Sequence, residues 1–305
     1  MKTVRIVIGG LPYFGRMLAE LLDGGDWECR YLPSAGRRPG GWATTLAEIA
    51  RADLIYLVGG QVERWSRPDW LLRCGRRRVV MHWVGTDVSC ALDAARRRRL
   101  SRRLVRGPQH WAEVPWTAAE LRPLGLDCEI VPLAPARLSQ VLPPLPPEFS
   151  VLTYLPDARP DFYGRPVVLR LAAAFPKVRF LVTGSEGNGW QAPQNMEFLG
   201  WQHEMAPVYA RGSVLLRLPE HDGLSFMVLE ALAAGRHVIW NHPFEGVLSA
   251  GDGQEAEMQL RALLDAHRSG TLRLNETGAA LVRTHYSRER LRSDLLARFE
   301  ALVAR

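Results

Sequence analysis

The stretch RLPEHDGLSFMVLEALAAGRHVIWN, from Arg217 to Asn241, decides the fold of this chain. The apolar run Ser213–Leu218, which leads into it, predicts a buried strand. The pattern then predicts a helix from about Ser225 to Ala234, ended by Gly235, and a second strand over His237–Trp240. Strand, turn, helix and strand in such close succession indicate a βαβ unit of a parallel sheet.

The turn before this helix, which contains Asp222 and Gly223, is a natural binding place for an anion. The first N–H groups of a helix have no partner within the helix, and the helix dipole adds roughly half a positive charge there. Glu230 follows within the helix among apolar residues. Its carboxylate therefore either reaches solvent as an ordinary helix residue or has a function.

The rest of the chain continues the alternation of strands and helices, which indicates a doubly wound α/β architecture. Strands are expected at 4–9, 27–32, 53–59, 78–83, 111–114, 129–133, 150–155, 178–183 and 196–199. Helices are expected at 14–22, 46–52, 69–73, 91–104, 118–124, 167–175, 204–210, 254–267, 276–284 and from 287 onward.

The proline-rich run Leu138–Pro147 interrupts this pattern, and we interpret it as a semi-rigid hinge between domains. We therefore expect a Rossmann-like domain over residues 1–142, a second over 143–285, and an amphipathic C-terminal helix over 286–305 that packs back toward the N-terminal domain. Two such domains facing each other across a cleft would bind their ligand at the carboxyl ends of the strands.

Composition limits the function classes. The chain has 305 residues, is 47% hydrophobic and carries a formal net charge of +7. It has no run of about 20 apolar residues that would span a membrane, and its β-branched N-terminus reads as a first strand rather than a signal peptide. Four scattered cysteines predict reduced thiols in a cytoplasmic protein without a zinc site.

The positive charge is concentrated between Arg96 and Arg106, where seven arginines fall in a helix expected over Ala91–Leu104. This run is either a solvated face or a patch for an anionic membrane surface. Nucleic acid is the poorer explanation, because no DNA- or RNA-binding motif accompanies the charge.

The run from Asp222 to Ile239 resembles the donor-site signature of the large family of retaining glycosyltransferases with the GT-B fold (the family 4 type, or glycosyl transferases group 1). That signature has an acidic residue and a glycine before Glu-Ala-x-Ala-x-Gly-x-Pro-Val. Phe198–Trp201 is similar to the F-x-G segment that precedes it, and Val182–Gly187 is similar to a strand ending in VGxG. The resemblance covers the second half of the chain, and implies a GT-B fold.

The resemblance also implies roles for individual residues. Glu230 matches the residue that binds the donor ribose. Asp222 matches an acid beside the reacting sugar that is usually Glu, and it is our first catalytic candidate, although Asp is also a common turn residue. Tyr163 stands where the family has Lys, so that Arg159 or Arg165 would supply the charge for the diphosphate. The remaining donor-side candidates are Gly164, Gly184, Ser185, Trp201, His221, Gly223, Leu224, Ser225 and Phe226.

In the first half the candidates are weaker. His82 ends an expected strand and is our second catalytic candidate, against the alternative of a satisfied core histidine. Gly9 and Gly10 after the first strand, and Gly85 and Asp87 in a G-T-D turn, are expected on the acceptor side, with plain strand-to-helix turns as the alternative.

The resemblance thus implies a cytoplasmic, metal-independent retaining glycosyltransferase that needs no cofactor and is peripheral at the inner membrane face. Its partners would be a nucleoside-diphosphate sugar, an acceptor glycan or glycolipid and an anionic membrane surface met through Arg96–Arg106. One alternative is a non-catalytic sugar-nucleotide-binding or regulatory relative, which Tyr163 and Asp222 favour. Another is an oxidoreductase, which the missing G-x-G-x-x-G fingerprint disfavours.

Overall fold

The computed structural model describes residues 3–33, 41–74 and 78–304, and its contacts divide the chain into two α/β units. The first unit contains the residues up to Ala136, the short segment Asp222–Leu224 and the residues from Arg288 onward. The second unit contains Arg137–His221 and Ser225–Ser287. Each unit is built around its own parallel sheet.

The first sheet has the strand order β2-β1-β3-β4-β5-β6, and all its neighbouring strands are parallel. The central strands β3 and β4 are apolar and buried on both faces, as parallel sheets require. The strands are β1 (Val4–Gly10), β2 (Trp27–Tyr31), β3 (Leu54–Val58), β4 (Arg78–Trp83), β5 (Gln109–Ala112) and β6 (Cys128–Ile130).

Helices cover both faces of this sheet. On one face Met81 and Trp83 pack against α4, α5 and α6, and Val7 and Val79 pack near α2 and α3. Phe299 of α12 packs on the opposite face. The helices of this unit are α1 (Pro12–Leu22), α2 (Gly41–Arg51), α3 (Arg67–Cys74), α4 (Thr86–Arg96), α5 (Arg102–Arg106), α6 (Pro115–Leu121) with a 3₁₀ turn (Arg122–Leu124), and α12 (Arg288–Val303).

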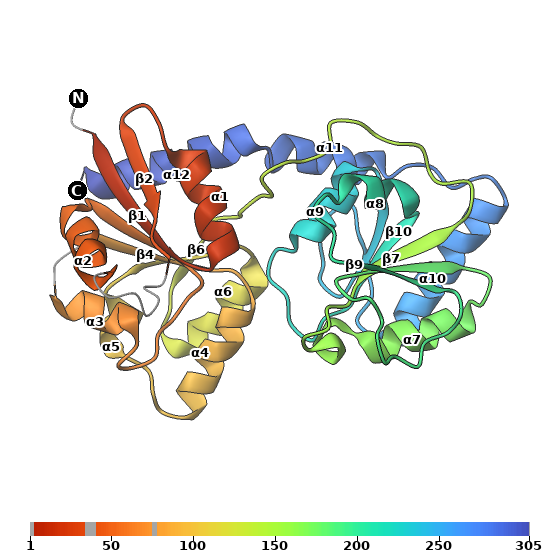
Figure 1. Cartoon of the computed structure of the whole chain (residues 1–305), viewed down its shortest axis with the longest axis horizontal. Coiled ribbons are helices and arrows are strands. Elements are labelled where there is room, and N and C mark those ends of the chain that lie inside the picture. Colours follow the sequence, from red (N-terminus) through yellow and green to blue (C-terminus); the bar gives the residue numbers. More distant parts are fainter. Residues whose placement is uncertain (1–2, 34–40, 75–77, 305) are drawn as a thin grey trace. The chain divides into compact units, whose positions relative to one another are not determined.

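The C-terminal helix α12 belongs to the first unit, as was expected of the amphipathic helix at the end of the chain (Figure 1). Phe299 is fully buried, stacks on Trp111 at a ring distance of 5.5 Å and meets Tyr56 edge-on at 5.2 Å. Arg292 Nε donates a hydrogen bond of 3.0 Å to the carbonyl of Leu21, at the end of α1. The helix therefore completes the core of the unit that contains the N-terminal strands.

The arginine-rich segment forms two helices rather than the single one expected over Ala91–Leu104. The first helix, α4, ends at Arg96, and Arg98 then takes a left-handed conformation with φ of 56°. Ser101 caps the second helix, α5, with its Oγ accepting from the N–H of Leu104 at 3.5 Å. The single helix was expected because arginine favours helices. Serine, however, is a preferred N-cap residue, so a new helix begins after Ser101.

The second sheet has the strand order β12-β11-β10-β7-β8-β9, again with parallel neighbours. It contains the predicted unit β10–α9–β11, and adds the two-residue strand β12, which was not expected. The strands are β7 (Ser150–Tyr154), β8 (Arg179–Thr183), β9 (Met196–Gly200), β10 (Val214–Arg217), β11 (His237–Trp240) and β12 (Leu248–Ser249).

The main core of this unit packs α7 and α10 on one face of the sheet, and α9 with α11 lies on the other (Figure 1). None of the helices in the described part of the chain has the length and apolar character needed to cross a membrane. The helices here are a 3₁₀ helix (Pro160–Tyr163), α7 (Arg165–Ala174), α8 (Ala206–Arg211), α9 (Phe226–Ala233), α10 (Gly253–Arg268) and α11 (Glu276–His285).

The proline-rich segment lies with the second unit, whose first residue is Arg137. The side chain of Arg236 is 1% exposed and donates to the carbonyls of Pro143 at 2.6 Å and Pro144 at 3.1 Å. Arg283 donates to the carbonyl of Ser139 at 3.1 Å. These bonds hold the segment to the second unit.

Candidate functional site

The strand order of the second sheet places a site between β7 and β10. Successive strands run outward from β7 in one direction and from β10 in the other, so the order reverses between these two neighbours. In open α/β sheets ligands bind at such a switch point, outside the carboxyl ends of the strands. Here β7 ends with Tyr154 and β10 ends with Arg217.

Three side chains meet at this point. The rings of Tyr154 and Tyr163 contact edge-on at 5.2 Å, and the guanidinium of Arg217 lies 5.8 Å from the centre of the Tyr163 ring. Burial raises the pKa of Tyr154, the neighbouring Tyr163 raises it further, and the charge of Arg217 opposes them. The Arg217 cation thus lies over the ring of Tyr163, an arrangement that stabilises guanidinium groups. Sequence reasoning missed Arg217, because it read the residue as part of a buried strand.

The turn over Pro160–Gly164 fixes the chain that follows Arg217. Gly164 has φ of 85°, and a Cβ there would lie 2.6 Å from the carbonyl oxygen of Leu218. The N–H of Glu220 donates to the carbonyl of Phe162 at 2.8 Å. Gly164 is therefore required for a close backbone approach, and Tyr163 beside it is positioned to hold Arg217.

The two arginines predicted to serve the diphosphate have other contacts. Arg159, exposed and left-handed with φ of 61°, lies over the ring of Phe162 at 4.3 Å. Arg165 forms an ion pair of 2.6 Å with Asp161 and lies over the ring of Trp190 at 5.2 Å. These contacts do not join either arginine to Tyr154 or Arg217.

Gly184 belongs to the site at the switch point, because a Cβ on it would lie 2.6 Å from the ring of Tyr154. Ser185 is 1% exposed, and its Oγ donates a hydrogen bond of 2.5 Å to Asp157. Its hydroxyl therefore fixes the loop after β7. Trp201, which follows β9, is 68% exposed.

The helix α9 carries Glu230 as predicted. Ser225 is the N-cap residue, although its side chain makes no capping bond, and Phe226 begins the helix. Glu230 Oε2 accepts a hydrogen bond of 2.7 Å from the hydroxyl of Tyr209 in α8. Burial raises the pKa of Glu230 to about 7, against the lowering effect of Tyr209. Glu230 is thus a half-buried carboxyl group that changes its charge near neutrality.

The segment Asp222–Leu224 belongs to the first unit, while His221 before it is half-buried in the second. The indole N–H of Trp116 donates to the carbonyl of Asp222 at 2.9 Å, and the N–H of Leu224 donates to Glu113 Oε2 at 3.3 Å. Leu224 was expected on the donor side, and in the structure its N–H is bonded to Glu113.

Glu113, directly after β5, is a second residue that sequence reasoning missed. It is 1% exposed, and its Oε1 has no hydrogen-bond partner among the described residues. Burial holds its pKa well above the usual range, the N–H of Leu224 opposes this, and the neighbouring Asp87 and Asp222 raise it further. A Cβ on Gly223 would lie 2.3 Å from the carbonyl oxygen of Val84 and 3.0 Å from Glu113 Oε2, so the backbone of Val84 requires glycine here.

Two of the first-unit candidates have structural roles. His82 is fully buried, with Nδ1 bonded to Tyr56 Oη at 2.6 Å and Nε2 bonded to the carbonyl of Val131 at 2.8 Å. Burial lowers its pKa to about 3. Asp87 accepts the N–H groups of Gly60 at 2.5 Å and Gly85 at 2.7 Å. The geometry therefore fits the core-histidine and turn alternatives for these two residues.

The predicted glycines lie at tight backbone positions of the first unit. Gly10 ends β1 with φ of 101°, and Gly9 precedes it at the carboxyl end of the same strand. Gly85 has φ of 136°, and a Cβ on it would lie 3.0 Å from the N atom of Gly223.

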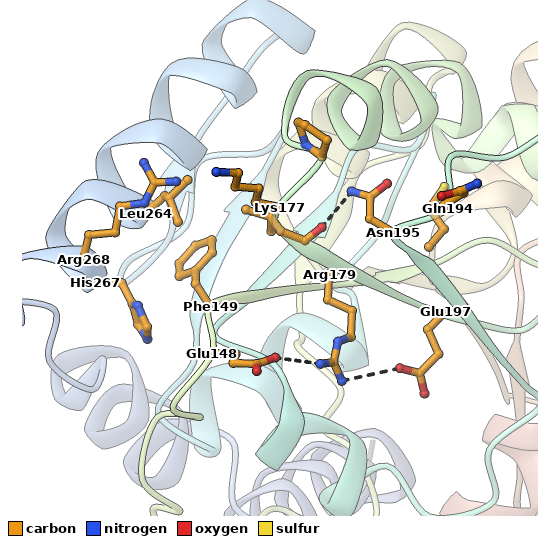
Figure 2. A pocket seen from close by; sticks show the side chains of 13 residues that line it. Glu148, Phe149, Lys177, Arg179, Gln194, Asn195, Glu197, Leu264, His267 and Arg268 are labelled. Atoms are coloured by element: carbon orange, nitrogen blue, oxygen red, sulfur yellow. Dashed lines mark hydrogen bonds and ion pairs between the residues drawn. The ribbon is translucent and has the colours of Figure 1, made fainter.

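A cavity of about 550 Å³ lies at the opposite end of the second sheet, where strands β7, β8 and β9 begin. Figure 2 shows Arg179 held between two carboxylates, Glu148 at 2.6 Å and Glu197 at 3.9 Å. None of the predicted site residues lines this cavity, and we do not assign the donor site to it. Within the described residues, no group of three or more His, Cys, Asp or Glu side chains is arranged to hold a metal ion.

Comparison with solved structures identifies the architecture as that of the GT-B glycosyltransferases. The chain is similar to sucrose-phosphate synthase from Thermosynechococcus elongatus, with a TM-score of 0.75, 13% identity and 99% of each chain covered. It is also similar to HepE from Anabaena, solved with UDP and glucose, with a TM-score of 0.64, 11% identity, and 98% of this chain and 100% of that one covered.

A glycosyltransferase from Rickettsia africae gives a TM-score of 0.65 at 11% identity, with 99% of each chain covered. No model of a known protein family matches the sequence, and no curated protein matches it. At these identities the likeness establishes the fold.

Proposed function

We propose that this protein is a retaining glycosyltransferase that moves a sugar from a nucleoside-diphosphate sugar to an acceptor hydroxyl. The observation that carries the proposal is that Arg217 and Glu230 belong to one β10–α9–β11 unit at the switch point of its sheet. From Ser225 to Glu230 is about 7–8 Å along a helix at roughly 1.5 Å per residue. A diphosphate near Arg217 and the start of α9 leaves the ribose within reach of Glu230.

The reaction depends on stabilising the diphosphate as it leaves. Arg217 and the N–H groups at the start of α9 neutralise its charge without a metal ion or another cofactor. Asp222 or a backbone carbonyl steadies the positive charge that develops on the sugar. The acceptor hydroxyl attacks from the face that the diphosphate leaves, so the configuration of the sugar is retained. The structures of HepE with UDP and glucose support a donor of this class.

The acceptor in this proposal is a glycan or a glycolipid, handled by a protein that is cytoplasmic and peripheral at the inner membrane face. The second candidate is a sugar-nucleotide-binding relative without catalytic activity. Tyr163 in place of Lys and Asp222 in place of Glu favour it.

A thermal-shift panel of UDP, GDP, ADP, their sugars and NAD(H) tests the proposal. A ligand that binds only the folded state raises the melting temperature, so one nucleoside diphosphate and its sugar should do so. NAD(H) should produce no shift. The donor that binds is then incubated with candidate acceptors, with and without a chelator, and the anomer formed is read by NMR. Binding without release of the diphosphate would favour the non-catalytic relative, and no shift with any nucleotide would contradict both candidates.

A further inference from the structure

The first unit carries a surface that combines exposed arginines with exposed tryptophans. All seven arginines between Arg96 and Arg106 are exposed. Trp65 is 68% exposed and Trp70 is 57% exposed, which is unusual for the largest apolar side chain. We call these residues together the arginine–tryptophan surface.

Hydrogen bonds hold the two parts of this surface side by side, although 36 positions in the sequence separate Arg64 from Leu100. The N–H of Arg64 donates to the carbonyl of Arg99 at 2.8 Å, and its Nε donates to the carbonyl of Leu100 at 2.9 Å. The N–H of Ser101 donates to the carbonyl of Val62 at 2.8 Å. The loop that carries Trp65 is therefore fixed against the turn that carries the arginines.

A buried carboxylate adds a second connection. Asp69 is 1% exposed; its Oδ1 accepts the hydroxyl of Ser101 at 2.5 Å and its Oδ2 accepts the N–H of Trp65 at 3.1 Å. Ser101 is the N-cap of α5, and Asp69 lies one residue before Trp70 in α3. One buried residue thus positions both tryptophan-bearing segments and the second arginine helix.

Most of the positive charge on this surface is available to a partner. Asp93 pairs with Arg97 at 2.9 Å, and Glu63 pairs with Arg99 at 3.3 Å. Within the part of the chain that the structure describes, the other five arginines of the run make no ion pair. The surface therefore favours an anionic partner.

We infer that the arginine–tryptophan surface docks the protein on an anionic lipid bilayer. Arginines attract acidic headgroups, and tryptophan side chains settle at the boundary between headgroups and acyl chains. The long arginine side chains let the charges reach headgroups while the two rings enter the boundary. The inference depends on the exposed charge and aromatic area, and it holds whether or not the protein transfers a sugar.

Flotation with vesicles of phosphatidylcholine, with and without phosphatidylglycerol, tests this inference. The protein should bind the anionic vesicles at low salt and the neutral vesicles weakly. The triple variant Arg98→Gln, Arg102→Gln, Arg106→Gln should bind the anionic vesicles about a hundredfold less, at roughly fivefold per arginine. The double variant Trp65→Ser, Trp70→Ser should lose the binding that remains at high salt, together with the blue shift of tryptophan emission.

The second unit provides matched controls. Trp201 is 68% exposed, as Trp65 is, and the side chains of Arg261 and Arg268 are 58% and 60% exposed. The variants Trp201→Ser and Arg261→Gln with Arg268→Gln should bind vesicles like the unchanged protein. All the altered side chains are exposed, so a thermal melt of each variant should match that of the parent.

Two results would overturn the inference. One is a lack of the expected differences in vesicle binding: the parent binds neutral and anionic vesicles equally, or the parent, the triple variant and the double variant bind anionic vesicles equally. The other is binding of a single-stranded RNA oligonucleotide that the same substitutions abolish, with no binding to vesicles. Because the assay needs no nucleotide sugar, failure here leaves the proposed sugar transfer standing, and failure of the nucleotide panel leaves this surface standing.

Discussion

The substitution Glu230→Gln should stabilise the free protein at alkaline pH and weaken its binding of nucleotide. Glu230 is held beside the hydroxyl of Tyr209 at 2.7 Å. Burial raises its pKa from 4.5 to about 7. A carboxyl whose pKa is higher in the folded than in the unfolded state keeps its proton on folding. The free energy of unfolding therefore falls as pH rises between these two values.

The size of this effect follows from the two pKa values. At about 1.4 kcal/mol for each pH unit, ionised Glu230 costs the folded state about 3 kcal/mol above pH 7. The glutamine side chain in the variant would keep a similar shape and an oxygen that accepts from Tyr209, and it would carry no charge. Its amide needs new partners at about 1 kcal/mol or more, so we expect a net gain of about 1–2 kcal/mol above pH 7. Near pH 3, well below both pKa values, the gain should vanish, because the wild-type carboxyl is then neutral in the folded and the unfolded state.

The same change should reduce affinity for a nucleoside diphosphate. A carboxylate that accepts ribose hydroxyls makes hydrogen bonds of about 1.5–3 kcal/mol, and an amide makes weaker ones, so a loss of about tenfold is expected. Urea titrations across this pH range measure the first effect, and titration calorimetry measures the second. The exposed residue Glu204 provides the control variant Glu204→Gln, which should change neither quantity.

Two results would refute this reasoning. If the stability difference between Glu230→Gln and the parent does not grow with pH, burial does not hold the proton on Glu230. If the substitution Glu230→Gln weakens binding of a 2′,3′-dideoxy nucleotide as much as binding of the ordinary nucleotide, Glu230 does not bind ribose hydroxyls.

Three further predictions concern single positions. Arg217→Gln should weaken UDP binding about tenfold or more and leave uridine binding unchanged, because a charged hydrogen bond contributes about 1.5–3 kcal/mol; equal losses in calorimetry would contradict a phosphate contact. Arg98→Gly should raise the free energy of unfolding by about 0.5–1 kcal/mol, because φ of 56° strains a side chain. In the same urea titration Arg97→Gly, at φ of −82°, should lower it, and similar effects at both sites would contradict the strain. Gly164→Ala should destabilise the protein by at least about 1 kcal/mol more than Gly270→Ala. Both glycines have positive φ, but only at Gly164 would a Cβ meet backbone within 4 Å, so equal melting temperatures would refute the close approach.

The sequence predicted the two parallel sheets because their strands are continuous apolar runs between helices with clear periodicity. The α/β architecture and the return of the last helix to the first unit are confirmed. The predicted helix boundaries were wrong where the backbone conformation of a single residue ends a helix. Arg98 ends the first arginine helix by turning left-handed, and arginine carries no local signal for that conformation.

Those residues of the candidate site whose positions depend on the local sequence pattern could be predicted. Glu230 lies in a helix between two predicted strands, so its place could be read from the sequence. Arg217 could not be assigned in this way, because its position beside Tyr154 and Tyr163 depends on the strand order. Glu113 shows the same limit, since its partner Leu224 lies more than a hundred residues away. The roles predicted for the other site residues stay predictions.

The docking of α12 has a consequence for synthesis of the chain in the cell. Strands β1 to β6 are complete by Ile130, yet Trp111 and Tyr56 are covered by Phe299. At about 5–20 residues per second, roughly 10–30 seconds pass between synthesis of these two parts. During that interval the first sheet leaves the ribosome with an uncovered aromatic face, while the whole second unit is being made. A chaperone that binds exposed aromatic surface would therefore meet this chain before its own C-terminal helix does.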